Sequence, residues 1–318
     1  MRVLVLTAAE RLPDLSAMYR YLGRHLQLEL LVLNKVQQRG LRRTLAGVQW
    51  QQFERVLLDL PFRNIHQQSG FLATLEGLVI YEEDAYQNYL PGARRCGQFL
   101  RFYRRLPHAR VVVTGALLAE RLRADGVAVS FLAKGFDPSR LFVEPGPRDI
   151  ELAFIGRTAS STYAPRKALL QELAGCEPLQ VLRTEPGEAY RRMLNRVQIF
   201  VSADLGLHEY MAKSFEAMAC GCVVLAWRQA AEEAAIGLEE GKHLLLYSSL
   251  DELRRHLARM RREPALAQAL GQNGRVFVEQ HLSYEHLAAG LSQVLQEPTL
   301  PYVAPARWRW WWSRRSWA

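Results

Sequence analysis

Residues 214–226 carry one carboxylate, Glu216, in a run of small and apolar residues. The run predicts a helix that ends at Gly221, followed by a buried strand of mainly β-branched residues. A carboxylate among Ala, Met and Phe is costly to bury unless a hydrogen-bond donor reaches it. From this segment alone, a capping or surface-facing Glu216 is the simpler interpretation, and a ligand-binding carboxylate is the alternative.

A second group of functional residues follows a predicted strand at residues 151–155. Gly156 closes that strand, Arg157 begins a polar loop, and Arg166 and Lys167 open the helix that we expect over residues 165–173. Three cations beside a helix N-terminus can bind an anion through the helix dipole and through direct pairing. A solvated basic loop explains the same residues equally well.

The elements that must position these groups alternate between strands and helices. We expect strands over residues 3–7, 28–33, 55–60, 78–81, 111–114, 129–132, 151–155, 179–182, 199–202 and 223–226, with helices over 15–25, 117–124, 165–173, 188–197, 250–262 and 264–280. This alternation predicts an α/β protein with parallel sheets covered on both faces. A proline-rich break near residue 145 predicts two domains, 1–145 and 146–299, followed by a basic tail, 300–318. We expect the ligand in a central cleft, at the carboxyl ends of the strands.

Glycine placement narrows the kinds of α/β protein. Residues 7–11, after the first strand, contain no glycine, and the second half offers only Gly156 after its first strand. A nicotinamide-binding fingerprint is therefore not expected, and no Walker-type phosphate loop is present.

Composition and charge set broader limits. The 318 residues are 49% hydrophobic and 23% charged, which is typical of soluble globular proteins. The N-terminal apolar run is too short for a signal peptide, and the four cysteines lack zinc-site spacing, so we expect small core residues in a cytoplasmic protein. The net charge of +9 is concentrated in the first 148 residues and the tail. Such asymmetry indicates that one half meets an anionic surface.

With these motifs in place, residues 149–296 resemble the C-terminal domain of glycosyltransferases of the two-Rossmann-domain (GT-B) architecture, group 1 or family 4 type. Within that group the chain most resembles the spore-maturation-protein-like branch. The resemblance rests on residues 149–157, Arg166 and Lys167, 190–195, 208–221, 241–247 and 266–284. In the first half, where the resemblance is weaker, residues 134–142 are similar to the family's entry to the interdomain linker. The fold class that this implies is two Rossmann-like domains with parallel sheets facing a central cleft.

The resemblance implies a role for Glu216: its carboxylate would accept hydrogen bonds from both ribose hydroxyls of a nucleotide-sugar. The N-terminus of its helix would face the diphosphate. A bidentate acceptor suits two vicinal hydroxyls, and N–H groups suit phosphate. Arg157 and Lys167 would pair with the diphosphate, with Arg166 as the register alternative to Lys167. The expected donor-binding set also includes Gly156, Lys213 and Ser214, and Lys213 lies where the branch commonly has Arg.

One position departs from the family pattern. Retaining family 4 enzymes usually carry another Glu eight positions before the ribose carboxylate, and here His208 occupies that place, followed by Glu209. Either Glu209 substitutes through a small shift, or the donor sugar is held differently. His208 is also a candidate catalytic base, with a polar contact as the alternative.

The first domain is expected to hold the acceptor. Residues 81–86 follow a strand and concentrate three carboxylates beside aromatic residues. A general base or a ligand for a sugar hydroxyl is expected here, and we select Asp84 as the catalytic candidate. An acidic cluster at a helix N-terminus explains the segment equally well.

Basic and aromatic residues alternate in two segments. Arg101, Arg104 and Arg105 lie among aromatic residues and predict a basic amphipathic helix on anionic lipid. The tail repeats the pattern, with Trp308, Trp310, Trp311 and Trp312 among arginines, which suits the headgroup region of a membrane. Single-stranded nucleic acid is the competing partner, although no nucleic-acid-binding motif supports it. A tail without function is a further alternative.

These features lead to one functional expectation. We expect a glycosyltransferase that moves a sugar from a UDP- or GDP-sugar to a cell-surface glycan or lipid-linked saccharide, such as a lipopolysaccharide core, as a peripheral protein on the cytoplasmic face of the plasma membrane. No cofactor and no metal are expected, because Arg157, Lys167 and Lys213 can neutralise the diphosphate and no Asp-x-Asp motif is present. The alternatives are a family member that binds nucleotide or glycan without catalysis, and a nucleic-acid-binding or scaffold protein.

Overall fold

The computed structural model of the chain describes residues 1–159 and 164–302. The N-terminal sheet is parallel, with strand order β2-β1-β3-β4-β5-β6. In β1, Val3 and Val5 lie in the apolar cluster on one face of the sheet, whereas Leu4 and Leu6 lie in the cluster on the other. A continuous apolar run is therefore buried on both faces. The strands are β1 (Arg2–Ala8), β2 (Gln27–Leu33), β3 (Arg55–Asp59), β4 (Leu78–Glu82), β5 (Arg110–Val113) and β6 (Val129–Phe131).

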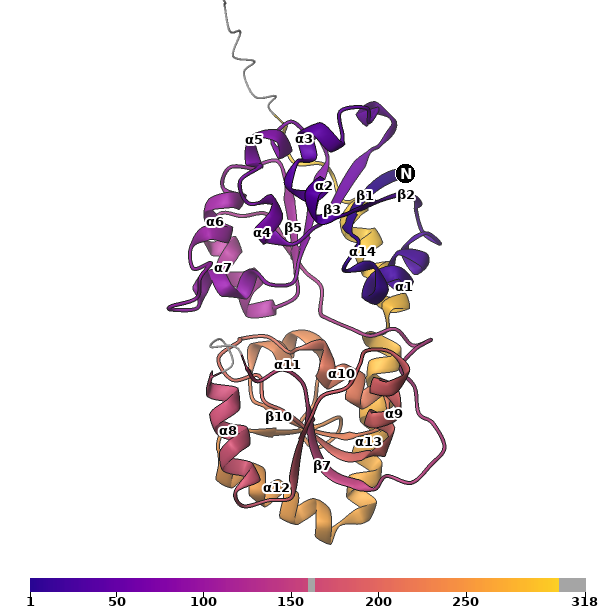
Figure 1. The fold of residues 1–318 in the computed structure, drawn as a ribbon, viewed down its shortest axis with the longest axis vertical. Helices are drawn as coiled ribbons and strands as arrows, with labels where there is room; N and C mark the ends of the chain where they lie inside the picture. Colours follow the sequence, from indigo (N-terminus) through magenta and orange to yellow (C-terminus); the bar gives the residue numbers. More distant parts are fainter. Residues whose placement is uncertain (160–163, 303–318) are drawn as a thin grey trace, which may run out of the picture.

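Helices cover both faces of this sheet (Figure 1). Besides α1 and α7, the sequence predicted only the basic amphipathic helix that includes Arg101, which is α6; the other short helices have no periodic pattern to detect. Helix α1 begins earlier than expected because Pro13 fits its first turn. The helices are α1 (Leu12–Leu22), α2 (Lys35–Arg39), α3 (Leu41–Thr44), α4 (Phe62–Ile65), α5 (Ser69–Leu72), α6 (Gln98–Tyr103) and α7 (Ala116–Ala124), with 3-10 turns η1 (Trp50–Gln52) and η2 (Ala85–Tyr89).

The C-terminal sheet is also parallel, in the order β11-β10-β9-β7-β8. Its strands are β7 (Ile150–Ile155), β8 (Leu179–Leu182), β9 (Val197–Ser202), β10 (Val223–Trp227) and β11 (Leu245–Tyr247). Its helices are α8 (Ala164–Ala174), α9 (Glu188–Arg196), α10 (Ala212–Ala219), α11 (Ala231–Ile236), α12 (Leu250–Arg262) and α13 (Pro264–His281). Every strand expected from the sequence is present, and α12 spans the predicted residues.

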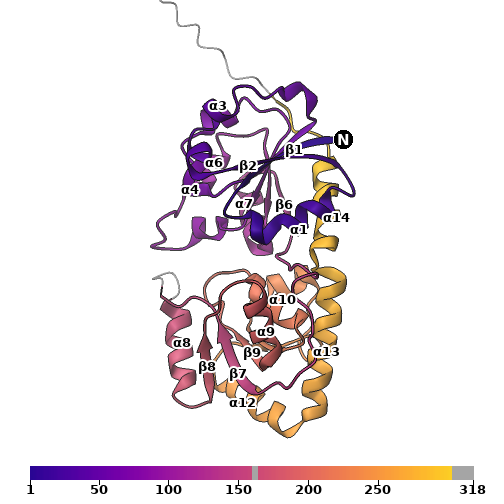
Figure 2. The ribbon, with the colours of Figure 1, turned by 45° about the vertical axis from the view of Figure 1, so that its right-hand side comes forward.

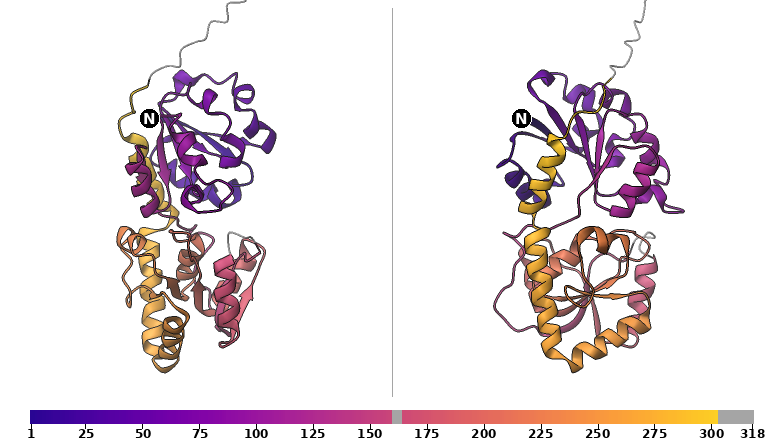
Figure 3. Two further views of the ribbon diagram at one scale, coloured as in Figure 1. Left: turned by 90° about the vertical axis from the view of Figure 1, so that its left-hand side faces the viewer. Right: turned by 180° about the vertical axis from the view of Figure 1, so that it is seen from behind.

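The chain crosses back to the N-terminal domain at its end. Helix α14 (Tyr284–Gln296) packs against α1, and Leu287, Leu291 and Leu295 are buried in the same apolar cluster as Val3 and Val5. Figures 2 and 3 show α13 against the C-terminal domain and α14 continuing along the N-terminal one. The boundaries drawn from the sequence grouped residues 284–296 with the C-terminal domain, because local pattern does not reveal which core an amphipathic helix covers.

Two segments meet at this crossing point. The backbone N–H of Phe136 donates to the carbonyl of Leu282, and the N–H of Tyr284 donates to the carbonyl of Phe136. A Cβ at Gly135 would lie 2.1 Å from the Leu282 carbonyl oxygen, so only glycine permits this approach. The chain therefore passes between the domains twice, and the two crossing segments are hydrogen-bonded to each other.

None of the helices in residues 1–159 and 164–302 combines the length and the hydrophobicity that a membrane span requires.

Candidate functional site

Glu216 lies on α10 with two partners that orient it. The Tyr190 hydroxyl of α9 donates to Glu216 Oε2 at 2.7 Å, and Lys213 Nζ lies 4.4 Å from the centroid of the Tyr190 ring. Burial raises the pKa of Glu216, while Lys213 and the Tyr190 hydrogen bond act in the opposite direction. Tyr190 occupies one carboxylate oxygen and leaves Oε1 for a ligand. Glu216 is half-buried and lies beyond the first turn of α10, so it is neither an N-cap residue nor a fully exposed surface residue.

Cations gather on the same side of this domain. Burial lowers the pKa of Lys213, and the positive charges of Arg157, Arg166 and Arg183 lower it further. Arg157 and Arg183 are exposed and follow the carboxyl ends of the paired strands β7 and β8. An anion is the ligand that would relieve this concentration of positive charge. Sequence reasoning missed Arg183, although its place directly after a predicted strand was a usable signal.

Gly156 and the start of α10 complete this side of the site. A Cβ at Gly156 would lie 2.8 Å from Phe154 Cζ and 3.6 Å from Lys213 Cδ, so the glycine lets these side chains approach the backbone. The N-cap residue of α10, Met211, provides no side-chain hydrogen bond to the helix. Backbone N–H groups at such an end suit a phosphate.

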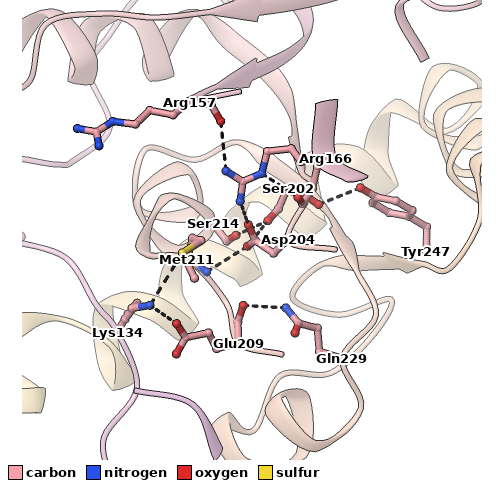
Figure 4. A network of polar contacts seen from close by, with 11 residues as sticks. Lys134, Arg157, Arg166, Ser202, Asp204, Glu209, Met211, Ser214, Gln229 and Tyr247 are labelled. Atoms are coloured by element: carbon pink, nitrogen blue, oxygen red, sulfur yellow. Dashed lines mark hydrogen bonds and ion pairs between the residues drawn. The ribbon is translucent and has the colours of Figure 1, made fainter. Parts of the chain in front are cut away.

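Arg166 and Ser214, expected among the donor ligands, belong to a buried network instead (Figure 4). The Arg166 guanidinium donates to the Ala203 carbonyl at 2.9 Å and pairs with Asp204 Oδ1 at 2.7 Å. Ser214 donates to Ser202 Oγ at 2.7 Å. Asp204 Oδ2 accepts from the Met211 N–H at 3.0 Å. This network fixes the loop before α10. Of the two cations that could face a diphosphate from α8, Arg166 is therefore buried, whereas the side chain of Lys167 is exposed.

Glu209, the expected substitute for the missing carboxylate, is fully buried and turned toward the N-terminal domain. It accepts hydrogen bonds from Lys134 Nζ at 2.7 Å and from Thr114 Oγ1 at 3.1 Å. Burial raises the pKa of Glu209 to about 7, against the attraction of Lys134. Burial also disfavours charged Lys134, but Glu209 and Glu83 outweigh it and raise the lysine pKa.

His208 is exposed and has a φ of 57°, in the left-handed region. Burial of its ring and the charge of Arg121 on α7 lower the pKa of His208. Since Arg121 belongs to the N-terminal domain, His208 lies where the domains face each other. A left-handed non-glycine residue at such a place is a typical feature of a functional loop.

The acidic residues after β4 divide between core and surface. Glu82 is buried, accepts the Asp84 N–H at 2.9 Å, and has a pKa raised by burial to about 8. Glu83 pairs with Arg11 at 3.2 Å, and although burial opposes it, Arg11 and Lys134 lower the pKa of Glu83. Asp84 is exposed beside them, and its charge reaches Lys134.

The prediction of a lipid-binding amphipathic helix is wrong for its aromatic residues. Phe99, Phe102 and Tyr103 of α6 are buried in the core of the N-terminal domain, so they are not available to lipid. A basic-aromatic alternation looks the same whether its apolar face meets lipid or a protein core. Arg101, Arg104 and Arg105 remain exposed. Trp308, Trp310, Trp311 and Trp312 lie outside the described residues.

Among the described residues, one group of side chains has metal-ligand spacing: Glu240, Glu252 and His256, with ligand atoms within 4.8 Å of one another. Arg228 pairs with both carboxylates, at 2.8 Å and 3.5 Å, and already supplies the positive charge. This group therefore gives no reason to expect a cation.

Comparison with known proteins tests the resemblance to GT-B glycosyltransferases. Residues 158–293 match a family model described as glycosyl transferase-like. No curated protein matches the chain by sequence. Among solved structures, Anabaena Alr3699/HepE in complex with UDP is similar at a TM-score of 0.66 and 14% identity, over 93% of this chain and 99% of that one. The chain has the GT-B fold.

Further solved structures agree with this fold. Sucrose-phosphate synthase from Thermosynechococcus elongatus has a TM-score of 0.67 at 13% identity, over 92% of this chain and 98% of that one. T4 phage BGT in complex with UDP-glucose has a TM-score of 0.57 at 8% identity, over 93% and 100%. The similar structures confirm the expected GT-B fold, and the domain match over residues 158–293 agrees with the expectation of a glycosyltransferase. They do not extend to the spore-maturation-like branch.

Proposed function

We propose that this GT-B protein transfers a sugar from a nucleoside-diphosphate sugar, with a UDP-sugar as the first choice. The observation that carries the proposal is the oriented carboxylate of Glu216 beside the cations Lys213, Arg157 and Arg183. A carboxylate with one free oxygen suits ribose hydroxyls, and cations near an uncapped helix end suit a diphosphate. The similar Alr3699/HepE and T4 phage BGT structures contain UDP or UDP-glucose, which supports the choice of UDP.

The chemistry requires few groups. The oxygen of an acceptor hydroxyl forms a bond to the anomeric carbon, and the bond from that carbon to the phosphate oxygen breaks. The nucleoside diphosphate leaves with the electron pair, and the cations stabilise its growing charge. The hydroxyl proton passes to a base. Our expectation that no metal takes part stays a prediction, and unchanged turnover in excess EDTA is its test.

His208 and Asp84 are the proposed candidates for the base. The lowered pKa of His208 keeps its imidazole neutral near pH 7, which is the form that accepts a proton. Asp84 lies on the acceptor side and is exposed. Loss of the acidic limb of the pH–rate profile in His208→Asn or in Asp84→Asn assigns the role, and an unchanged profile in both excludes them.

A thermal-shift screen with UDP, GDP, ADP and CMP and their sugars tests the donor site. We expect UDP or UDP-sugars to raise the midpoint, and Glu216→Ala to abolish the shift. Glu263→Gln is the control, since Glu263 lies between α12 and α13 and its pair with Arg259 on α12 is exposed. No stabilisation of the wild-type chain by any of these nucleotides would refute the proposal.

A binder without catalysis is the second candidate, and Glu209 favours it. That carboxylate is committed to Lys134 and Thr114, so the donor-sugar end lacks the acidic group that the resemblance implied. Nucleotide binding without release of UDP, in the presence of a membrane extract as acceptor source, would establish this candidate. Release of UDP that stops in Glu216→Ala would exclude it.

We further propose a glycan or lipid-linked acceptor at the cytoplasmic face of the plasma membrane, with membership of the spore-maturation-like branch. The exposed arginines of the N-terminal domain support the anionic surface. Flotation with phosphatidylglycerol vesicles should weaken when Arg101, Arg104 and Arg105 become Gln, and when the chain ends at residue 302. Undiminished flotation of both variants would contradict the proposal, and equal affinity for single-stranded DNA would favour nucleic acid.

A further inference from the structure

The loop between β9 and α10 is inserted into the other domain. Leu207 is 2% exposed within the apolar cluster of the N-terminal domain, and Met211 packs against that cluster. Between them, Glu209 accepts hydrogen bonds from Thr114, the residue directly after β5, and from Lys134 in the crossing segment. The loop thus makes apolar and polar contacts across the domain boundary.

A second carboxylate crosses the boundary from α11. Glu232 is 1% exposed, and its two oxygens accept the N–H groups of Ala116 at 3.1 Å and Leu117 at 3.0 Å. These are first-turn amides of α7, and the N-cap residue there, Gly115, has no side chain to satisfy them. A residue of one domain therefore caps a helix of the other.

A hydrogen bond connects the segments that carry Glu209 and Glu232. The side-chain amide of Gln229 donates to the backbone carbonyl of Glu209 at 3.0 Å, which ties the Glu209 loop to the segment that leads into α11. A Cβ at Gly115 would lie 3.2 Å from both Cβ and Oε2 of Glu209. A side chain at position 115 would therefore press on Glu209, so the small size of Gly115 eases this contact between the domains.

We propose that Glu209 and Glu232 form an interdomain latch, received by Thr114, Lys134 and the first amides of α7, which holds the domains closed on each other. Both are positioning residues and neither touches the donor. By holding the domains together, the latch would also set how far the N-terminal domain lies from the donor residues Lys213 and Glu216 of α10. Only this last consequence rests on the proposed function.

Amide-resolved hydrogen exchange tests the latch without any substrate. In the wild-type chain we expect strong protection of Ala116 and Leu117, falling by about tenfold or more in Glu232→Ala because a carboxylate–amide hydrogen bond is lost. Gly115→Ala perturbs the same contact from the other domain and should act in the same direction. Exchange of these amides at unprotected rates in the wild-type chain would overturn the proposal, even if every variant failed to fold.

Small-angle scattering measures the domain arrangement. The double variant Glu209→Gln/Glu232→Ala should have a larger radius of gyration than the wild type, and Glu263→Gln should not. Lys134→Met and Glu209→Gln should each lower the exchange protection of the Ala116 and Leu117 amides. Because both substitutions break the same ion pair, combining them should cost less than the sum of the two single effects. An unchanged radius with retained protection in the double variant would contradict the latch.

Kinetics distinguish a latch from a donor ligand. Glu209→Gln should lower kcat about tenfold or more and leave the KM for the UDP-sugar within about twofold, because the donor contacts lie on the C-terminal domain. A weakened UDP-sugar affinity with unchanged amide protection would show that Glu209 contacts the donor. If no nucleotide binds at all, the proposed function fails while exchange and scattering still decide the latch.

Discussion

At the residue scale, the candidate site depends on one oriented carboxylate. Glu216 was visible in the sequence as an isolated acid in an apolar helix, but its partner Tyr190 was not, because the two belong to different helices. The hydroxyl that approaches Oε2 fixes the carboxylate rotamer before a ligand arrives. Preorganisation of this kind reduces the ordering cost of binding.

Tyr190→Phe isolates that hydroxyl. The variant keeps the ring beneath Lys213 and removes only the hydrogen bond to Glu216, so we expect UDP to bind about tenfold more weakly. Isothermal titration measures the affinity. In a Glu216→Ala background the same change should have no further effect, and a full additional loss there would show that Tyr190 acts independently of Glu216.

Glu82 makes stability depend on pH. Its pKa of about 8 in the folded chain lies above the ordinary value of 4.5, so between these values the folded state holds a proton that the unfolded state has released. The free energy of unfolding attributable to Glu82 therefore falls as pH rises from 4.5 to 8, by at most about 1.4 kcal/mol per unit.

Glu82→Gln should remove this fall. Urea unfolding at several pH values between 5 and 9 gives the difference between the variant and the wild type, and we expect it to grow in favour of the variant up to about pH 8 and then level off. A constant difference across that range would mean that Glu82 is ionised in the folded chain throughout.

At the element scale, the loop before α10 is the part that the sequence described least well. Its base is fixed by the buried pair of Arg166 and Asp204, with Ser202 and Ser214 completing the network in Figure 4. The motif placed Arg166 beside a helix start, and that was correct, but burial on α8 turns it inward. One residue along the helix, Lys167 faces solvent.

Arg166→Met should destabilise the C-terminal domain by about 3–5 kcal/mol, because it leaves Asp204 buried without its partner. Denaturant unfolding measures the loss. Arg261→Gln is the matched control, since its pairs with Glu151 and Glu177 lie near the surface and should cost about 1 kcal/mol or less. Equal effects of the two substitutions would show that burial does not set the strength of the Arg166 pair.

At the scale of the whole molecule, the domains are joined by more than a linker. The crossing segments pair through Phe136, α14 returns to cover the N-terminal sheet, and the latch closes the facing side. These connections link residues that are far apart in the chain. The C-terminal helix is thus part of the N-terminal core.

Leu291→Ala tests that dependence. Leu291 is 2% exposed beside Val3 and Val5, so the truncation should cost about 2–5 kcal/mol and act on the N-terminal domain. Val276→Ala, at a 37% exposed position of α13, is the control and should cost little. Hydrogen exchange locates the effect: a loss of protection confined to the C-terminal sheet would contradict the packing of α14 described above.

The sequence by itself determined the alternation of strands and helices, the parallel sheets and the identity of Glu216 as the carboxylate to examine. It did so because runs of β-branched residues and helical periodicity are local properties of the chain. Only the tertiary structure decided that Tyr190 orients Glu216, that Arg183 joins the cations, that Arg166 is structural, that the aromatic residues of α6 are core, and that Glu209 crosses to Lys134 and Thr114. Each of these depends on which groups the fold brings together and on how much water it removes from them, and neither quantity is written in the spacing of residues along the chain.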